Sequence, residues 1–220
     1  PAVHHAPKAE KDRLERLEVR GLSYTYPGTE KGIHDVNLCL ERGSLTVITG
    51  RIGSGKSTLL RALLGLLPPE AGELRWNGER VGDPATFLVP PRCAYTAQVP
   101  LLFSETLRDN ILLGLPSEAV DLPEALRLAV MEEDVAQLER GLDTLLGAKG
   151  VKLSGGQRQR AAAARMVVRQ PELLVLDDLS SALDVETERA LWERLFSAGD
   201  QFTCLAVSHL LGGSMSSRLF

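Results

Sequence analysis

Two glycine-rich segments hold the residues whose types and spacing suit the binding of nucleotide phosphates. The first, residues 50–58, fits the phosphate-binding loop G-x4-G-K-[ST] at every fixed position. In such a loop the ammonium of Lys56 reaches the phosphate oxygens and the Ser57 hydroxyl ligates Mg²⁺. The alternative, a glycine-rich turn that only caps a helix, has no need of the lysine. The candidate binding residues are Gly50, Arg51, Ile52, Gly53, Ser54, Gly55, Lys56, Ser57 and Thr58.

The second segment, residues 153–160, reads Leu-Ser-Gly-Gly-Gln-Arg-Gln-Arg and lies far downstream of the first. It opens an alanine-rich run, residues 157–169, that is expected to be helical, and the free N–H groups at a helix start attract anions. One fold cannot easily bring both segments to the same nucleotide. The simplest solution is that two copies, or two related chains, face each other with a nucleotide between them. The candidate residues here are Ser154, Gly155, Gly156 and Gln157.

Two adjacent carboxylates are the candidates for metal binding and acid–base chemistry. They are Asp177 and Asp178, which follow the short apolar run 173–176. Such a run is typical of a buried strand, and open α/β sheets bind nucleotides at the carboxyl ends of their strands. We expect Asp177 to hold Mg²⁺ through water, as the corresponding acid does in phosphate-loop ATPases. Its alternative role is to cap the helix that follows.

The elements that must position these residues can be read from the hydrophobic pattern. Residues 45–49 form a buried strand that feeds the phosphate loop, and residues 56–67 form a helix stopped by two prolines. Residues 105–146 are mostly helical, notably 123–140, and an apolar run at 203–207 is typical of a parallel sheet. Further strands are expected at 17–20, 22–26, 36–40 and 73–78. The pattern predicts an α/β protein with two lobes, a nucleotide core and a helical insert.

Composition limits the classes of function. The chain has 220 residues, 44% of them hydrophobic and 25% charged, as in a soluble globular domain. A net charge of −4 gives no global attraction to nucleic acid or anionic lipid. Three widely spaced cysteines favour reduced thiols in a cytosolic setting. Residues 1–17 are polar and are expected to form a solvated tail or linker; a connector helix from an upstream domain is the alternative.

With its motifs in this order, the chain resembles the ATP-binding cassette (ABC) ATPases, whose signature is LSGGQ, over residues 18–209. The resemblance implies a phosphate-loop NTPase core with a RecA-like mixed sheet, an antiparallel β subdomain and a helical insert at approximately 99–165. Residues 101–111 and 141–144 are similar to those of exporter-type transporters. The implied cofactors are ATP and Mg²⁺. The implied partners are a second cassette and a transmembrane domain upstream in the same polypeptide, with the domain on the cytoplasmic side of the membrane and no nucleic acid partner.

The resemblance also assigns roles to single residues. Tyr26 matches the aromatic that stacks on adenine, although an aromatic at this place could instead belong to the core. Gln98 matches the glutamine that contacts Mg²⁺ and water and joins the two lobes. His209 matches the histidine that contacts the γ-phosphate, and residues 181–184 match the loop where two cassettes touch. Asp178 stands where the family normally has the glutamate that acts as general base, so the implied catalytic residues are Asp178, His209 and Gln98.

Three departures from the family pattern affect the expected activity. Asp178 is one methylene shorter than glutamate, which places its carboxylate about 1.5 Å short of the same point and predicts slow hydrolysis. Residues 147–150 lack the acidic residue that exporters often carry, and residues 210–220 are expected to be a truncated end or a linker-like tail. Two alternatives stay open. One is a degenerate cassette that clamps ATP with little hydrolysis, and the other is a soluble, non-transport ABC ATPase.

Overall fold

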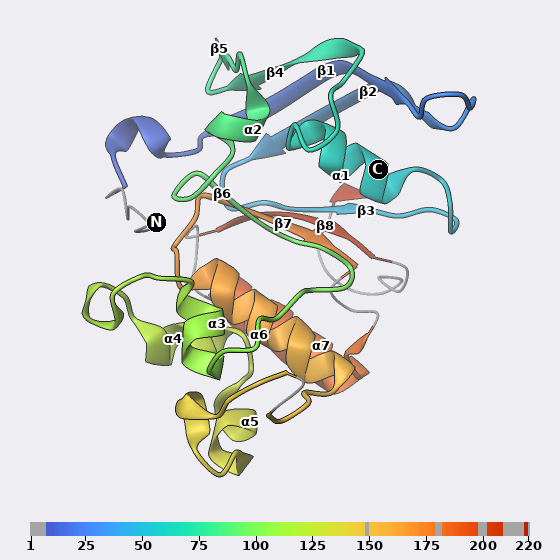
Figure 1. Cartoon of the computed structure of the whole chain (residues 1–220). Coiled ribbons are helices and arrows are strands. Elements are labelled where there is room, and N and C mark those ends of the chain that lie inside the picture. The colour runs from blue at the N-terminus through green and yellow to red at the C-terminus, as the bar shows by residue number, and fades with distance from the viewer. Residues whose placement is uncertain (1–7, 148–149, 179–181, 198–201, 209–217, 220) are drawn as a thin grey trace.

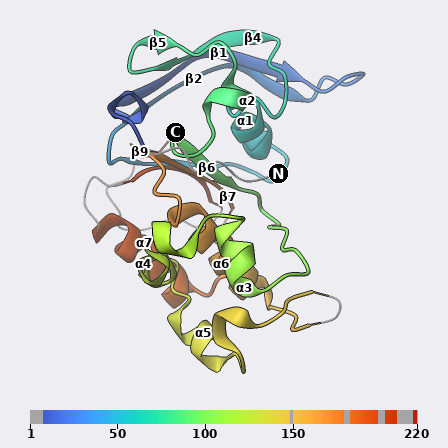
Figure 2. The same ribbon diagram turned by 60° about the vertical axis from the view of Figure 1, so that its left-hand side comes forward.

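The structure is a computed structural model that describes residues 8–147, 150–178, 182–197, 202–208 and 218–219. Its elements lie in layers (Figure 1). Helix α1 (Lys56–Leu63) lies between an antiparallel sheet and a parallel sheet, and further helices pack on the opposite side of the parallel sheet (Figures 1 and 2). Two clusters of buried apolar residues fill the spaces on either side of the parallel sheet.

The antiparallel sheet has the strand order β2-β1-β4-β5. Burial alternates along β1, because Leu17 and Val19 point into the core beneath the sheet whereas Glu18 and Arg20 point outward. The bounds of its strands are Arg16–Thr25 (β1), Gly32–Glu41 (β2), Ala71–Trp76 (β4) and Glu79–Arg80 (β5).

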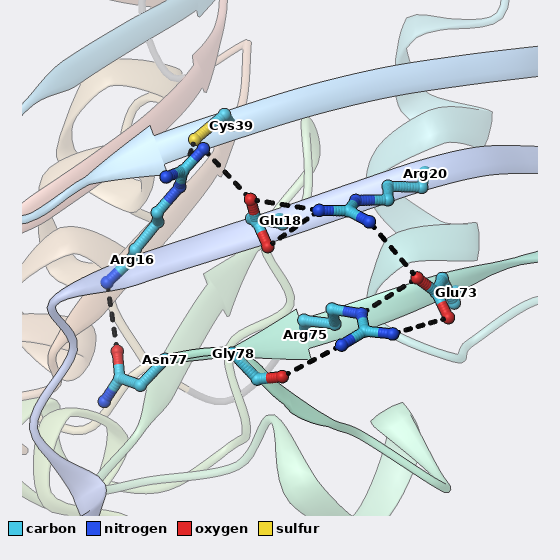
Figure 3. Close-up of polar contacts among 8 residues, drawn as sticks. All are labelled: Arg16, Glu18, Arg20, Cys39, Glu73, Arg75, Asn77 and Gly78. Carbon is cyan, nitrogen blue, oxygen red and sulfur yellow. Dashed lines mark hydrogen bonds and ion pairs between the residues drawn. The ribbon is translucent and has the colours of Figure 1, made fainter.

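The outward face of this sheet carries rows of paired charges (Figure 3). Glu18 pairs with Arg16 at 2.9 Å, and Glu73 pairs with Arg75 at 2.8 Å on the neighbouring strand. The guanidinium of Arg16 also lies 3.1 Å from the sulfur of Cys39 on β2. These interleaved charges keep the outer face polar, so the sheet buries only its other face.

The described strands of the second sheet are all parallel, in the order β6-β7-β8-β3-β9. Every residue of β3, β7 and β8 is buried, as expected for strands covered on both faces. The strands are Leu45–Ile48 (β3), Cys93–Thr96 (β6), Leu173–Asp177 (β7), Thr203–Val207 (β8) and Arg218–Leu219 (β9). The expected α/β class, with a parallel and an antiparallel sheet, is confirmed.

The helical layer is built around α6 and α7, which lie against the parallel sheet (Figure 1). Its α-helices are Leu107–Leu112 (α3), Leu122–Leu128 (α4), Glu132–Gln137 (α5), Gly155–Val167 (α6) and Val185–Ser197 (α7). A further helix, Pro84–Phe87 (α2), precedes β6, and short 3₁₀ turns span Glu10–Asp12 (η1), Ser117–Ala119 (η2) and Gly141–Asp143 (η3).

The structure differs from the pattern-based expectation in two helices. One continuous helix over 123–140 does not form, because Val130 adopts a left-handed φ of 55° and separates α4 from α5. The turn allows Met131 to be fully buried while its N–H still donates to the carbonyl of Leu126. Helix α1 ends at Leu63 rather than at residue 67.

Both chain ends also differ from the expected tails within the described residues. Leu14 is fully buried, and its N–H donates to the carboxylate of Glu172 at 2.8 Å. Asp12, itself buried, pairs with Arg92 at 2.6 Å. Within the segment expected to be solvated, Asp12, Leu14 and Leu17 are therefore buried, whereas the residues between them are exposed. At the other end, residues 218–219 form the short strand β9 beside β3.

Candidate nucleotide-binding site

The phosphate loop connects the buried strand β3 to helix α1 and closes around a lysine. The ammonium of Lys56 donates to the carbonyls of Gly50 and Arg51 at 2.7 and 2.8 Å, and the residue is only 8% exposed. Gly55 has a φ of 92°, and a Cβ there would lie 3.1 Å from the carbonyl oxygen of Gly32. The loop thus needs glycine for its own conformation as well as for any approach of phosphate.

Two of the three residues expected to hold magnesium, Ser57 and Asp177, lie together. The hydroxyl of Ser57 donates to Asp177 Oδ1 at 2.8 Å, across 120 residues of sequence. The Tyr95 hydroxyl lies 3.5 Å from the other carboxylate oxygen, and burial raises the pKa of Tyr95 while Arg61 opposes this shift. A hydroxyl and a carboxylate oxygen are ligands that suit Mg²⁺, which binds few protein groups and keeps several waters. The described residues hold no larger cluster of potential metal ligands.

Asp178 is buried and already bound to another predicted site residue. Its carboxylate Oδ2 accepts from the side-chain amide of Gln98 at 3.0 Å, and its N–H donates to the carbonyl of Val207 at 3.1 Å. Asp178 has a left-handed φ of 55°, which aspartate tolerates better than most residues. The two residues come from the ends of neighbouring strands, so the parallel sheet brings them together.

These residues line one cavity of about 400 Å³, which is of the size of small-ligand sites. Its walls are Tyr26, Lys31, Gly32, Ile52, Gly53, Gly55, Lys56, Ser57, Thr58, Gln98, Asp177, Asp178 and Val207. Tyr26 is half-buried, and its hydroxyl lies 3.1 Å from that of Thr58. Its ring is also nearly perpendicular to that of Tyr24, with the ring centroids 5.1 Å apart.

The signature segment forms the start of α6. Ser154 and Gln157 make a reciprocal capping box: the Ser154 hydroxyl accepts from the Gln157 N–H at 3.2 Å, and Gln157 Oε1 accepts from the Ser154 N–H at 2.9 Å. A Cβ on Gly156 would lie 2.9 Å from the carbonyl of Ala182, so this glycine is needed for close packing. None of the signature residues lines the cavity.

Sequence reasoning missed one residue that joins these two regions. Gln159 is 2% exposed, and its amide donates to the backbone carbonyl of Gln98 at 2.6 Å. Nothing in the sequence marked Gln159 apart from its nearness to the signature. Two predicted positions, His209 and Ser181, lie outside the described residues.

No helix within the described ranges has the length and apolar character needed to cross a membrane. The fold and the cavity define a phosphate-loop nucleotide-binding domain. A profile of the family described as ABC transporter matches residues 33–181, and the chain belongs to this family.

Relatives support the same assignment. The chain is 40% identical over 201 residues to an ATP-dependent lipid A-core flippase of Pseudomonas fluorescens, covering 89% of this chain and 33% of the relative. It is 37% identical over 217 residues to P-glycoprotein 14 of Caenorhabditis elegans, covering 93% of this chain and 16% of the relative. The chain therefore spans a third or less of these two relatives.

A solved structure, that of a bacterial Atm1-family ABC exporter with ATP bound, is similar to this chain with a TM-score of 0.80 and 27% identity. The match covers 96% of this chain and 36% of the other. The expected resemblance to the nucleotide-binding domain of an ABC exporter is confirmed.

Proposed function

We propose that this domain binds and hydrolyses Mg-ATP between two cassettes and that this cycle powers export by a transmembrane domain. The observation that carries the proposal is the cavity in which Lys56, Ser57, Gln98, Asp177 and Asp178 converge. The cavity contains an ammonium and a hydroxyl from the start of helix α1, and an amide and two carboxylates from the ends of two strands. These groups suit a triphosphate with its divalent cation.

Each predicted residue has a role in this proposal. Residues 50–58 hold the phosphates, with the enclosed Lys56 as their main positive partner, and Tyr26 stacks on the adenine. Ser57, Gln98 and Asp177 hold Mg²⁺, which would neutralise charge on the phosphates. Asp178 polarises the attacking water, and His209 contacts the γ-phosphate.

A second cassette completes the site. The signature residues are absent from the cavity wall, yet they present a capped helix start suited to anions. They also lie against Ala182, within the loop expected to touch a partner. We therefore propose that Ser154, Gly155, Gly156 and Gln157 contact the ATP held by the phosphate loop of the other cassette. Nucleic acid is not a proposed partner.

The remaining assignments follow from the relatives, whose names describe a flippase and P-glycoprotein 14. We propose that residues 18–209 are the cassette, with the helical insert at approximately 99–165. In this proposal a transmembrane domain precedes the cassette in the same polypeptide, and the cassette lies on the cytoplasmic side of the membrane.

One observation favours a second candidate function, in which the cassette clamps ATP with little hydrolysis. The residue at the position of the general base is aspartate, and its carboxylate already accepts a hydrogen bond from Gln98. A shorter carboxylate held in this way would serve poorly as a base.

The proposed function is tested first by nucleotide binding to the Lys56→Ala variant. Loss of a charge-assisted contact of about 1.5–3 kcal/mol should weaken Mg-ATP binding about tenfold or more. Lys11→Ala, which removes an exposed lysine from η1, is the matched control and should bind ATP normally. Titration of a fluorescent ATP analogue measures both. Equal affinities in folded proteins would contradict the phosphate-loop assignment.

Dimer formation tests the second part of the proposal. Sedimentation of an Asp178→Asn variant, which should retain bound ATP, is expected to show a monomer without nucleotide and a dimer with Mg-ATP. Ser154→Arg should prevent the dimer because its bulk occupies the place of the γ-phosphate. If the dimer forms equally with and without ATP, and also forms in the Ser154→Arg variant, then the two copies use a different interface.

A further inference from the structure

The signature serine is held, through one intermediate side chain, by a carboxylate from another helix. Asp134 lies on α5, and its Oδ1 accepts from the Gln157 side-chain amide at 3.1 Å. That contact fixes the orientation of the Gln157 amide, whose Oε1 then faces the Ser154 N–H at 2.9 Å. The chain of contacts therefore runs from Asp134 through Gln157 to Ser154.

Asp134 is also paired with an arginine of the signature helix. Arg160 donates to both carboxylate oxygens, with Nε at 2.9 Å from Oδ2 and one terminal nitrogen at 2.6 and 2.8 Å from the two oxygens. The side chains are only 12% and 14% exposed. A bidentate, largely buried ion pair between arginine and a carboxylate has a defined geometry. It fixes the direction of Asp134 with respect to α6.

The pairing also resolves an electrostatic conflict. An isolated carboxylate near the start of α6 would oppose the binding of another anion there. Because Arg160 neutralises Asp134, the carboxylate can orient Gln157 without placing a net negative charge beside the expected phosphate.

We propose that Asp134 is a positioning residue for the nucleotide-dependent interface: it holds the signature serine in the geometry that the partner's ATP requires. This inference rests on the proposed function, in which Ser154 contacts ATP bound to a second cassette. Asp134 itself does not touch the nucleotide.

Helix α5 provides a matched control. Glu132, on the same helix, makes an ion pair with Arg194 of α7 at 2.8 Å, and among the described residues it forms no hydrogen bond or ion pair with residues 153–160. Glu132→Gln removes a more exposed ion pair from the same helix, whereas Asp134→Ala removes the contacts to α6. Asp134→Asn keeps the shape and one acceptor oxygen but removes the charge.

The test measures ATP-dependent dimerisation of the 220-residue chain in the Asp178→Asn background. Asp134→Ala removes hydrogen bonds to a charged group, so we expect it to raise the dissociation constant of the dimer about tenfold or more. Asp134→Asn should have an intermediate effect. Glu132→Gln should stay within about twofold of the background protein, as for surface changes. Binding of Mg-ATP to the monomer, which uses the phosphate loop, should be unchanged in all three.

Two further measurements separate positioning from general loss of structure. Hydrogen exchange at the Ser154 amide should accelerate in Asp134→Ala and in Gln157→Leu but not in Glu132→Gln. The double variant of Asp134→Ala with Gln157→Leu should dimerise no worse than Gln157→Leu alone, because both changes interrupt the same chain of contacts.

The outcomes are distinguishable. If the background protein forms no dimer with ATP, the proposed function fails and the inference fails with it. If the background protein dimerises and Asp134→Ala dimerises equally well, only the inference fails. Stronger dimerisation of Asp134→Ala and Asp134→Asn alike would show that Asp134 acts through its negative charge, which would also overturn the positioning role.

Discussion

Replacing Asp178 by glutamate should increase the rate of ATP hydrolysis. Asp178 is 3% exposed, and its carboxylate accepts from the side-chain amide of Gln98 at 3.0 Å, which holds the carboxylate in place. One added methylene extends the carboxylate by about 1.5 Å towards the cavity. Misplacement of about 1 Å can cost a factor of about 100 in rate. We therefore expect Asp178→Glu to raise kcat by about 10- to 100-fold, or about 1.4–2.7 kcal/mol of activation free energy.

The same substitution should have a separate effect on stability. Residue 178 has a φ of 55°, a conformation that aspartate adopts more readily than glutamate. Asp178→Glu should therefore lower the free energy of unfolding by about 1–2 kcal/mol. A faster but less stable variant is the expected combination, and the two effects are measured independently by phosphate release and by chemical denaturation.

Steady-state phosphate release over an ATP titration separates kcat from KM. KM should change little, because the groups that hold the phosphates are untouched. Asp178→Asn is the matched control, since it keeps an acceptor for Gln98 but cannot take a proton, and it should reduce kcat. A general base normally contributes far more than a twofold increase in rate. If Asp178→Glu raises kcat by less than about twofold, the function as an ATP clamp is favoured. An ordinary wild-type rate that neither variant changes would refute Asp178 as the base.

Two further predictions concern the folded domain itself. Glu172→Ala should lower the free energy of unfolding by about 2–4 kcal/mol in a urea titration. The substitution leaves the buried N–H of Leu14 without an acceptor and removes the ion pair with Lys8. An effect no larger than that of replacing the exposed Glu139 by alanine would show that these contacts contribute little to stability. In the native protein a thiol reagent should modify Cys39 and spare Cys93 and Cys204, since burial raises the pKa of both and brings that of Cys204 to about 12. Rapid modification of more than one thiol would contradict this burial.

The parts of the fold that sequence could predict are those encoded by local pattern. The strand, loop and helix around Lys56 were predictable because a phosphate loop requires fixed residues at fixed spacing. The apolar runs that became β7 and β8 were predictable because parallel strands are buried on both faces. In each case the information lies within a few neighbouring residues.

The parts that sequence could not predict depend on distant partners. Leu14 packs into a buried apolar cluster, and its N–H is satisfied by the carboxylate of Glu172, 158 residues away. Val130 breaks the expected helix although valine disfavours a left-handed conformation, because the turn lets Met131 enter the core. No pattern in the sequence singles out Asp134, and its partner Arg160 is 26 residues away. No local pattern contains these pairings.

Helix α6 connects the contacts around the signature with those around the nucleotide cavity. Its first turn carries Ser154, which Asp134 orients from α5 through Gln157. One turn further on, Gln159 holds the backbone of Gln98, whose side chain binds Asp178. In the proposed dimer, the start of α6 would serve the partner's ATP while Gln159 supports the cavity of its own chain. A displacement of this one helix would therefore reach both nucleotide sites, because side-chain hydrogen bonds connect it to each of them.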